Sequence, residues 1–302
     1  MERFELTPRR GRLEMVASAI GFGLMATTAK AAASKGVPGA EVAFFRFLVG
    51  LVVVFAQARV RGVPLRPVRW DVLFWRGFFG GLAVLCYFLS IAALPVGTAT
   101  LLNYTAPVFS TLFAFLLLGE RPRLPVVAAF ALAASGVALV VVGQTGALGG
   151  GHGWIFLGIA SALMSGAAVT AIRAARRTDG SWEILGAFCL LGLVCTAPMT
   201  VLRWKTPDAT GWALLLAVGL ISVLAQLLMT HALKVVEAAQ SGVIQQLAVV
   251  TTFTCGALIY GDRLPAIALV GAALTLAGVS VAAWFAGRGG SSGFARRGGL
   301  PP

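Results

Sequence analysis

Long apolar blocks separated by short basic gaps constrain the fold of this chain more than any other feature. Each block holds roughly 20 residues, enough to cross a hydrocarbon core about 30 Å thick. We expect membrane-spanning helices at residues 15–34, 40–58, 70–93, 97–118, 124–143, 154–173, 182–202, 210–232, 238–260 and 264–286. Only 12% of the 302 residues are charged, which is too few to cover a soluble domain. The sequence therefore predicts an all-α polytopic membrane protein with ten transmembrane helices.

The basic residues lie in the gaps between the apolar blocks. A net charge of +13 would suggest nucleic acid in a soluble protein, but here the charges do not gather on one face, and we expect no nucleic-acid partner. If the loops are assigned to alternate sides of the membrane, 17 Lys and Arg residues fall on one side and 5 on the other. Because basic loops stay in the cytoplasm, this bias predicts a multi-pass protein of the inner (plasma) membrane with both termini cytoplasmic.

The two halves of the chain repeat each other weakly, with an offset of 139 to 143 residues. Ala17–Lys30 matches Ala160–Arg173, and Gly119–Pro125 matches Gly261–Pro265. Each half holds five spans, so the second must enter the membrane from the opposite side, which gives an inverted repeat suited to alternating access. The expected segments are a cytoplasmic N-terminus (1–13), a first five-helix repeat (14–143), a Gly-rich linker (144–153), a second repeat (154–286) and a disordered basic cytoplasmic tail (287–302).

Polar side chains interrupt the expected spans at matching places in the two halves. Such groups are costly in lipid and usually face a cavity or a protein partner. We expect a substrate-binding cavity between the fourth and ninth spans, lined by Tyr87, Asn103, Tyr104, Gln226, Gln245 and Gln246. Pro107 removes a backbone hydrogen bond and is expected to bend the fourth span as a gating element.

Charged side chains contribute little to this expected cavity. No carboxylate is placed at the middle of a span, which favours a zwitterionic or neutral substrate with an apolar body. Arg46 lies inside the second span, where a helix–helix tie or snorkelling is favoured over contact with an anion. His231 is expected to pack near the cytoplasmic interface.

Nothing in the sequence is typical of an enzyme. It contains neither a GxxxxGK[ST] phosphate loop nor an HExxH motif, and its four cysteines lack metal-ligand spacing. We therefore expect no catalytic residue, no metal and no cofactor.

The chain resembles the EamA-type members of the drug/metabolite transporter superfamily. The resemblance covers about residues 14–286, and it is carried by Gly23–Lys30, Phe44–Phe47, Ala92–Phe109, Leu116–Arg121, His231–Gly242 and Ala257–Pro265. It implies ten helices in two five-helix repeats, a central cavity and export of small metabolites. Among such proteins the chain is most similar to exporters of amino acids, including aromatic ones. Two mild departures are Asp262 in place of Glu and Val249 in place of Pro.

The expected function is thus secondary transport of amino acids or similar amphipathic metabolites by a monomer in the lipid bilayer, with export as the expected direction. An alternative is efflux of hydrophobic cationic drugs, although the first span lacks the glutamate that the small multidrug members of the superfamily carry. A channel is a weaker alternative, because no filter-like ring of residues is evident.

Overall fold

A computed structural model describes residues 7–62, 67–118, 124–145, 152–175, 178–236, 238–262 and 265–294. The regular structure among these residues is entirely α-helical, without strands. The helices are α1 (Pro8–Ser34), α2 (Gly39–Arg61), α3 (Trp70–Ala93), α4 (Val96–Asn103), α5 (Ala106–Leu118), α6 (Leu124–Thr145), α7 (His152–Ala175), α8 (Ser181–Leu202), α9 (Ala209–Ala232), α10 (Ala238–Gln245), α11 (Leu247–Tyr260) and α12 (Ala266–Phe294). Most of the expected linker and the last eight residues of the expected tail lie outside the described residues.

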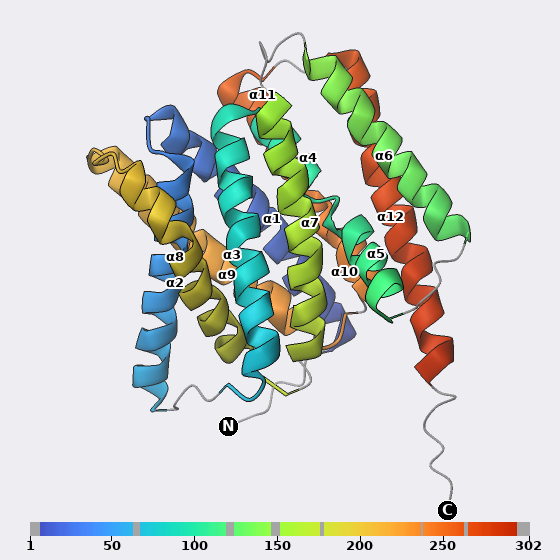
Figure 1. Cartoon of the computed structure of the whole chain (residues 1–302), viewed down its shortest axis with the longest axis horizontal. Coiled ribbons are helices and arrows are strands. Elements are labelled where there is room, and N and C mark those ends of the chain that lie inside the picture. The colour runs from blue at the N-terminus through green and yellow to red at the C-terminus, as the bar shows by residue number, and fades with distance from the viewer. Residues whose placement is uncertain are drawn as a thin grey trace, which may run out of the picture.

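Within the described part of the chain, seven helical segments are long and apolar enough to cross a membrane. They lie at 8–34, 39–60, 70–93, 153–172, 181–202, 209–232 and 241–260. Two shorter apolar segments lie at 124–140 and 266–282. The helices run side by side as one bundle, in which α1 begins and α12 ends at the same end (Figure 1).

Two helix ends differ from the sequence-based expectation. Helix α1 begins at Pro8 because Thr7 caps it: the Thr7 hydroxyl accepts a hydrogen bond from the backbone N–H of Arg10 at 3.3 Å. Helix α12 continues to Phe294, so residues 287–294, which were expected to be disordered, are helical. Extending an existing helix adds one hydrogen bond per residue, and no proline stops it there.

The expected fourth and ninth spans are each broken into two helices. After Asn103 the backbone tightens, and the N–H of Thr105 donates to the carbonyl of Leu102 at 3.2 Å before α5 begins. Pro107 is the second residue of α5. N–H groups in the first turn of a helix have no acceptor within that helix, so the proline costs α5 no hydrogen bond. The second break has no proline: the N–H of Gln246 donates to the carbonyl of Val243 at 3.1 Å. Helix α10 (238–245) begins and ends 142 residues after α4 (96–103).

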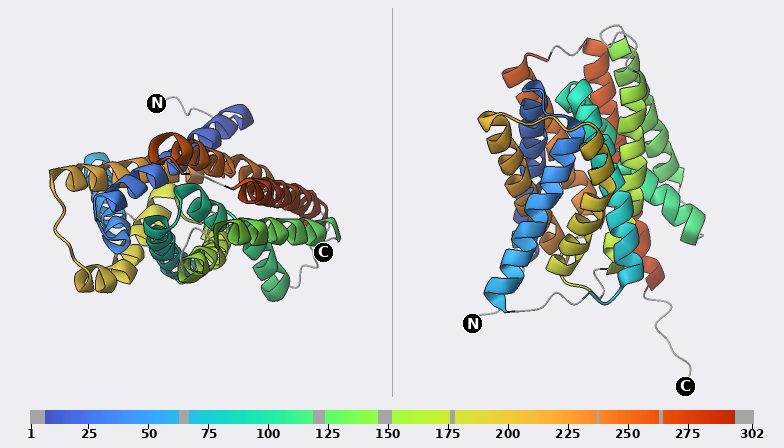
Figure 2. Two further views of the ribbon diagram at one scale, coloured as in Figure 1. Left: turned by 90° about the horizontal axis from the view of Figure 1, so that it is seen from above. Right: turned by 60° about the vertical axis from the view of Figure 1, so that its left-hand side comes forward.

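Close helix packing joins the two halves of the chain. The most extensive contacts pair α6 with α12, α3 with α7, and α1 with α9. Helices α6 and α12 form one edge of the bundle when it is seen from above (Figure 2). They approach closely because Gly136 lies against the backbone of Gly271: a Cβ on either glycine would lie 2.5 Å from the carbonyl oxygen of the other.

Candidate functional site

Asn103 ends α4 and turns toward α7. Its Nδ2 donates to the hydroxyl of Ser161, and to that of Ser165 at 3.2 Å. The two serines are four residues apart and therefore share one face of α7. Sequence reasoning missed both of them, although a pair of serines at this spacing within an apolar block was a usable signal.

The two helix breaks lie against each other. The side-chain Nε2 of Gln246, at the second break, donates to the backbone carbonyl of Tyr104, at the first break, at 3.4 Å. The Tyr104 ring packs against a buried cluster that includes Val140 of α6 and Val249 of α11. The structure thus brings together two of the expected residues, Tyr104 of the fourth span and Gln246 of the ninth.

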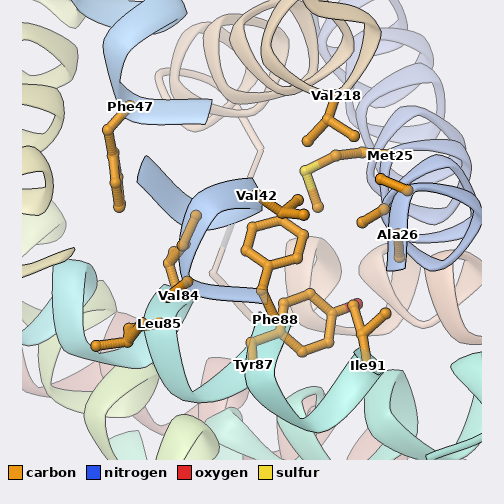
Figure 3. Close-up of a cluster of buried hydrophobic side chains, with 14 of the residues drawn as sticks. Met25, Ala26, Val42, Phe47, Val84, Leu85, Tyr87, Phe88, Ile91 and Val218 are labelled. Carbon is orange, nitrogen blue, oxygen red and sulfur yellow. The ribbon is translucent and has the colours of Figure 1, made fainter. Parts of the chain in front are cut away.

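Tyr87 lies one layer away, on α3. Its hydroxyl shares a 2.8 Å hydrogen bond with the hydroxyl of Thr100, which also donates to the carbonyl of Val96 within α4. The ring belongs to the main apolar cluster, where Tyr87 and Phe88 lie beside Val42 of α2 (Figure 3). Tyr87 therefore ties α3 to α4.

We expect Tyr87→Phe to remove this tie while keeping the packed ring. Loss of one such hydrogen bond costs about 1 kcal/mol of stability, because Thr100 keeps its bond to Val96. Thermal unfolding of the purified protein in detergent measures the loss. If transport falls steeply in Tyr87→Phe while the unfolding temperature barely moves, the hydroxyl serves the substrate instead of the fold.

The remaining two expected site residues face different neighbours. Gln226 is buried on α9, and within the described residues its Nε2 donates to the hydroxyl of Thr230 on the same helix, at 3.4 Å. Gln245 donates to Ser18 of α1 at 3.5 Å, and the Ser18 hydroxyl donates in turn to the carbonyl of Ala225 at 2.8 Å. The six expected residues therefore contact α1, α4, α7 and α9 without one network linking them all.

Arg46 is buried on α2, and its Nε donates to the hydroxyl of Ser222 on α9 at 2.5 Å. This bond is a helix–helix tie of the kind expected from the sequence. The guanidinium carbon also lies 5.5 to 5.8 Å from the ring centroids of Phe47, Phe88 and Phe188. Ser222 and Gln226 are one turn apart, so the arginine lies beside the polar face of α9.

Other charged groups serve the helix ends. Nδ1 of His231 lies 2.6 Å from a carboxylate oxygen of Glu14, which joins α9 to the start of α1. The Lys30 ammonium donates to the carbonyls of Ile91 and Leu94 at the end of α3, at 3.0 and 2.8 Å. Burial raises the pKa of the Asp262 carboxyl after α11, and the nearby Lys30 charge opposes that rise.

No group of three or more His, Cys, Asp or Glu side chains that could hold a metal occurs among the residues that the structure covers. All four cysteines carry free thiols. The polar groups of the site are amides, hydroxyls and guanidinium groups, which bind and orient small molecules by hydrogen bonding.

Comparison with known proteins decides the family. The model of the EamA-like transporter family matches the chain twice, over residues 9–142 and 152–284. The chain belongs to the EamA-like transporter family. The two matches cover the helices on either side of the 143–151 gap, and all six expected site residues lie within them.

Several relatives are named as transporters. The chain is 28% identical over 267 residues to the pseudopaline exporter CntI of Pseudomonas aeruginosa, covering 88% of this chain and 93% of that one. It is 29% identical over 222 residues to human solute carrier family 35 member E4, covering 69% and 63%. A solved crystal structure has the same fold, with a TM-score of 0.64, 23% identity, and coverage of 90% of this chain and 98% of that one.

Proposed function

We propose that this protein is a secondary transporter that moves small metabolites across the cytoplasmic membrane by alternating access. In this proposal ten spans form two inverted five-helix repeats, at 14–143 and 154–286, with both termini cytoplasmic. The observation that carries it is the pair of helix breaks 142 residues apart, which meet through Gln246 and Tyr104. Broken helices with exposed backbone groups are typical of transporter binding sites.

An asymmetry between the two breaks supports alternating access. Helix α4 packs against α11, whereas α10 and α5, which correspond to them after a shift of 142 residues, are not among the packed helix pairs of the described chain. In a pseudo-symmetric carrier, the helix pair at the closed end is in contact and the equivalent pair at the open end is apart. If α4 and α11 separated while α5 and α10 came together, the opening would move to the other side of the membrane.

For the substrate we propose amino acids, including aromatic ones, or similar amphipathic metabolites, moved outward by a monomer. The side-chain amides of Asn103, Gln245 and Gln246 suit the polar end of such a molecule, and the apolar cluster around Tyr87 suits its body. The outward direction follows the P. aeruginosa relative, which is named as an exporter. Efflux of cationic drugs is disfavoured, because α2 and α3 bury the two cations Arg46 and Arg76, and the buried carboxylate of Glu41 on α2 already accepts a hydrogen bond from the backbone N–H of Lys205 at 2.5 Å.

The test is counterflow in proteoliposomes. Vesicles are loaded in turn with unlabelled phenylalanine, tryptophan, leucine or threonine, and uptake of the same labelled amino acid is followed. We expect saturable counterflow that falls at least about tenfold in Asn103→Ala and Gln245→Ala, since each change removes a proposed substrate contact and Asn103→Ala also takes the amide donor away from the buried Ser161 hydroxyl. Ser135→Ala, on the exposed side of α6, is the matched control and should transport normally.

The outcomes separate the alternatives. If folded protein shows no counterflow with any amino acid, the amino-acid proposal fails, and cationic dyes form the next panel. A flux that does not saturate and shows no counterflow would indicate a channel.

A further inference from the structure

Arg76 is a buried arginine that the expected site does not include. It lies on α3, is 4% exposed, and its guanidinium carbon is 3.8 Å from the centroid of the Phe188 ring on α8. Its Nε has no hydrogen-bond partner among the residues that the structure describes. The side chain extends over Gly80, one turn further into the membrane, where a Cβ would collide with the guanidinium group. Glycine at that position therefore leaves room for the charge.

Arg46 reaches the same aromatic ring from α2. Its guanidinium carbon is 5.6 Å from the Phe188 centroid, and the side chain is 5% exposed. Since both guanidinium carbons are measured from one centroid, at 5.6 and 3.8 Å, they lie at most 9.4 Å from each other. Two cations thus face one small region between α2, α3 and α8.

Neither cation has an acidic partner in the part of the chain that the structure describes. The ion pairs found there are Arg10–Glu14, Arg69–Asp71 and His231–Glu14. Aromatic faces and the Ser222 hydroxyl favour a guanidinium group, but they bring no negative charge. Two like charges buried at membrane depth remain unfavourable until an anion joins them.

We propose that Arg46 and Arg76 together bind the carboxylate of the transported substrate. The inference rests on the proposed function, because both groups are enclosed and the helix movement of alternating access must open them. A guanidinium group presents parallel N–H donors that match the two oxygens of a carboxylate. Ser222, which accepts the hydrogen bond from Arg46, is one turn from Gln226 on α9, and the Phe88 ring that lies 5.8 Å from the Arg46 guanidinium carbon follows Tyr87 on α3, so this anion site lies near two of the expected binding residues.

The test compares a carboxylate with its uncharged amide. Purified protein in detergent is titrated with phenylacetate and phenylacetamide, and in parallel with phenylalanine and phenylalaninamide, at constant ionic strength, while thermal stabilisation is recorded. We expect the carboxylates to bind at least about tenfold more tightly than the amides, because a charge-assisted pair replaces an ordinary contact. Arg76→Gln should abolish this preference, and Arg76→Lys should keep part of it.

The control is Arg69→Gln. Arg69 is exposed just before α3 and already pairs with Asp71, so its replacement should leave the carboxylate preference unchanged. A second measurement needs no variant: phenylglyoxal modifies arginine side chains, and saturating phenylacetate should slow modification of Arg46 and Arg76 in the wild-type protein but not that of Arg69. This keeps the test valid if Arg76→Gln does not fold.

Equal binding of carboxylate and amide, absence of carboxylate binding, or an unchanged preference in folded Arg76→Gln would overturn the inference. Failure of the proposed function has a different signature. Phenylacetate would then bind in an Arg76-dependent manner while counterflow of every amino acid is absent, which points to a carboxylate substrate of another kind.

Discussion

Leucine in place of Gly136 is expected to separate α6 from α12 and to cost about 3 kcal/mol of stability or more. A Cβ at this position would lie 2.5 Å from the carbonyl of Gly271 and from the backbone N–H and hydroxyl oxygen of Thr275. Backbone atoms cannot rotate away as a side chain can, so the helices themselves must move apart. In a membrane, close packing of this kind supplies much of the force between helices. The expected readout is a large fall in the temperature at which the purified protein unfolds in detergent.

The neighbouring residue provides the matched control. Ser135 is exposed about 100° around α6 from Gly136, and its hydroxyl donates to the carbonyl of Ala131 in its own helix, at 2.9 Å. Ser135→Leu adds the same side chain one residue away and should leave the unfolding temperature within a few degrees of wild type, since exposed changes are usually within about 0.5 kcal/mol. If both variants unfold alike, close packing at Gly136 does not stabilise the bundle.

A disulfide between α4 and α11 should stop transport. Gly97 faces the Phe253 ring so closely that a Cβ on Gly97 would overlap it, and Phe253→Cys makes room for a bond to Gly97→Cys. If the carrier works by parting these helices, fixing one arrangement removes the other from the equilibrium. We expect counterflow near the level of protein-free vesicles after oxidation and recovery after reduction with dithiothreitol.

The four native cysteines must first be replaced by alanine so that the new pair is the only one that can form. The Phe253→Cys single variant, treated with the same oxidant, and the double variant kept reduced should both keep their activity. Mass spectrometry shows whether the bond has formed. A cross-linked protein that still performs counterflow would mean that α4 and α11 stay together throughout the cycle.

The helices could be predicted from sequence because apolar length decides them. Trp70–Ala93 coincides with the expected third span, and the other helices end within a few residues of expectation except at the two termini of the chain. At the N-terminus the Thr7–Pro8 pair is a usual helix-start signal, but it precedes the apolar block, so a reading based on hydropathy missed it.

The breaks and the site contacts were harder to predict. Pro107 pointed to a disturbed fourth span, yet the equivalent break at Gln246 occurs without a proline, because it depends on tertiary contacts that a local pattern does not contain. The partners of Asn103 could not be found for the same reason: Ser161 and Ser165 are 58 and 62 residues away. Arg46 was expected to tie helices together, which it does, but the second cation beside Phe188 depends on how α3 meets α8.

The contact surface between α6 and α12 has an internal two-fold pseudo-symmetry. Gly136 meets Gly271 and Thr275, while Gly278 meets Ala129 and Ala133. A shift of 142 residues turns one set of contacts into the other, so each helix presents the same surface to its partner. Such a surface is self-complementary, as in the interfaces of two-fold homodimers. A single copy of the five-helix unit would carry both sides of this contact surface, and two copies inserted in opposite orientations could close it without any covalent link.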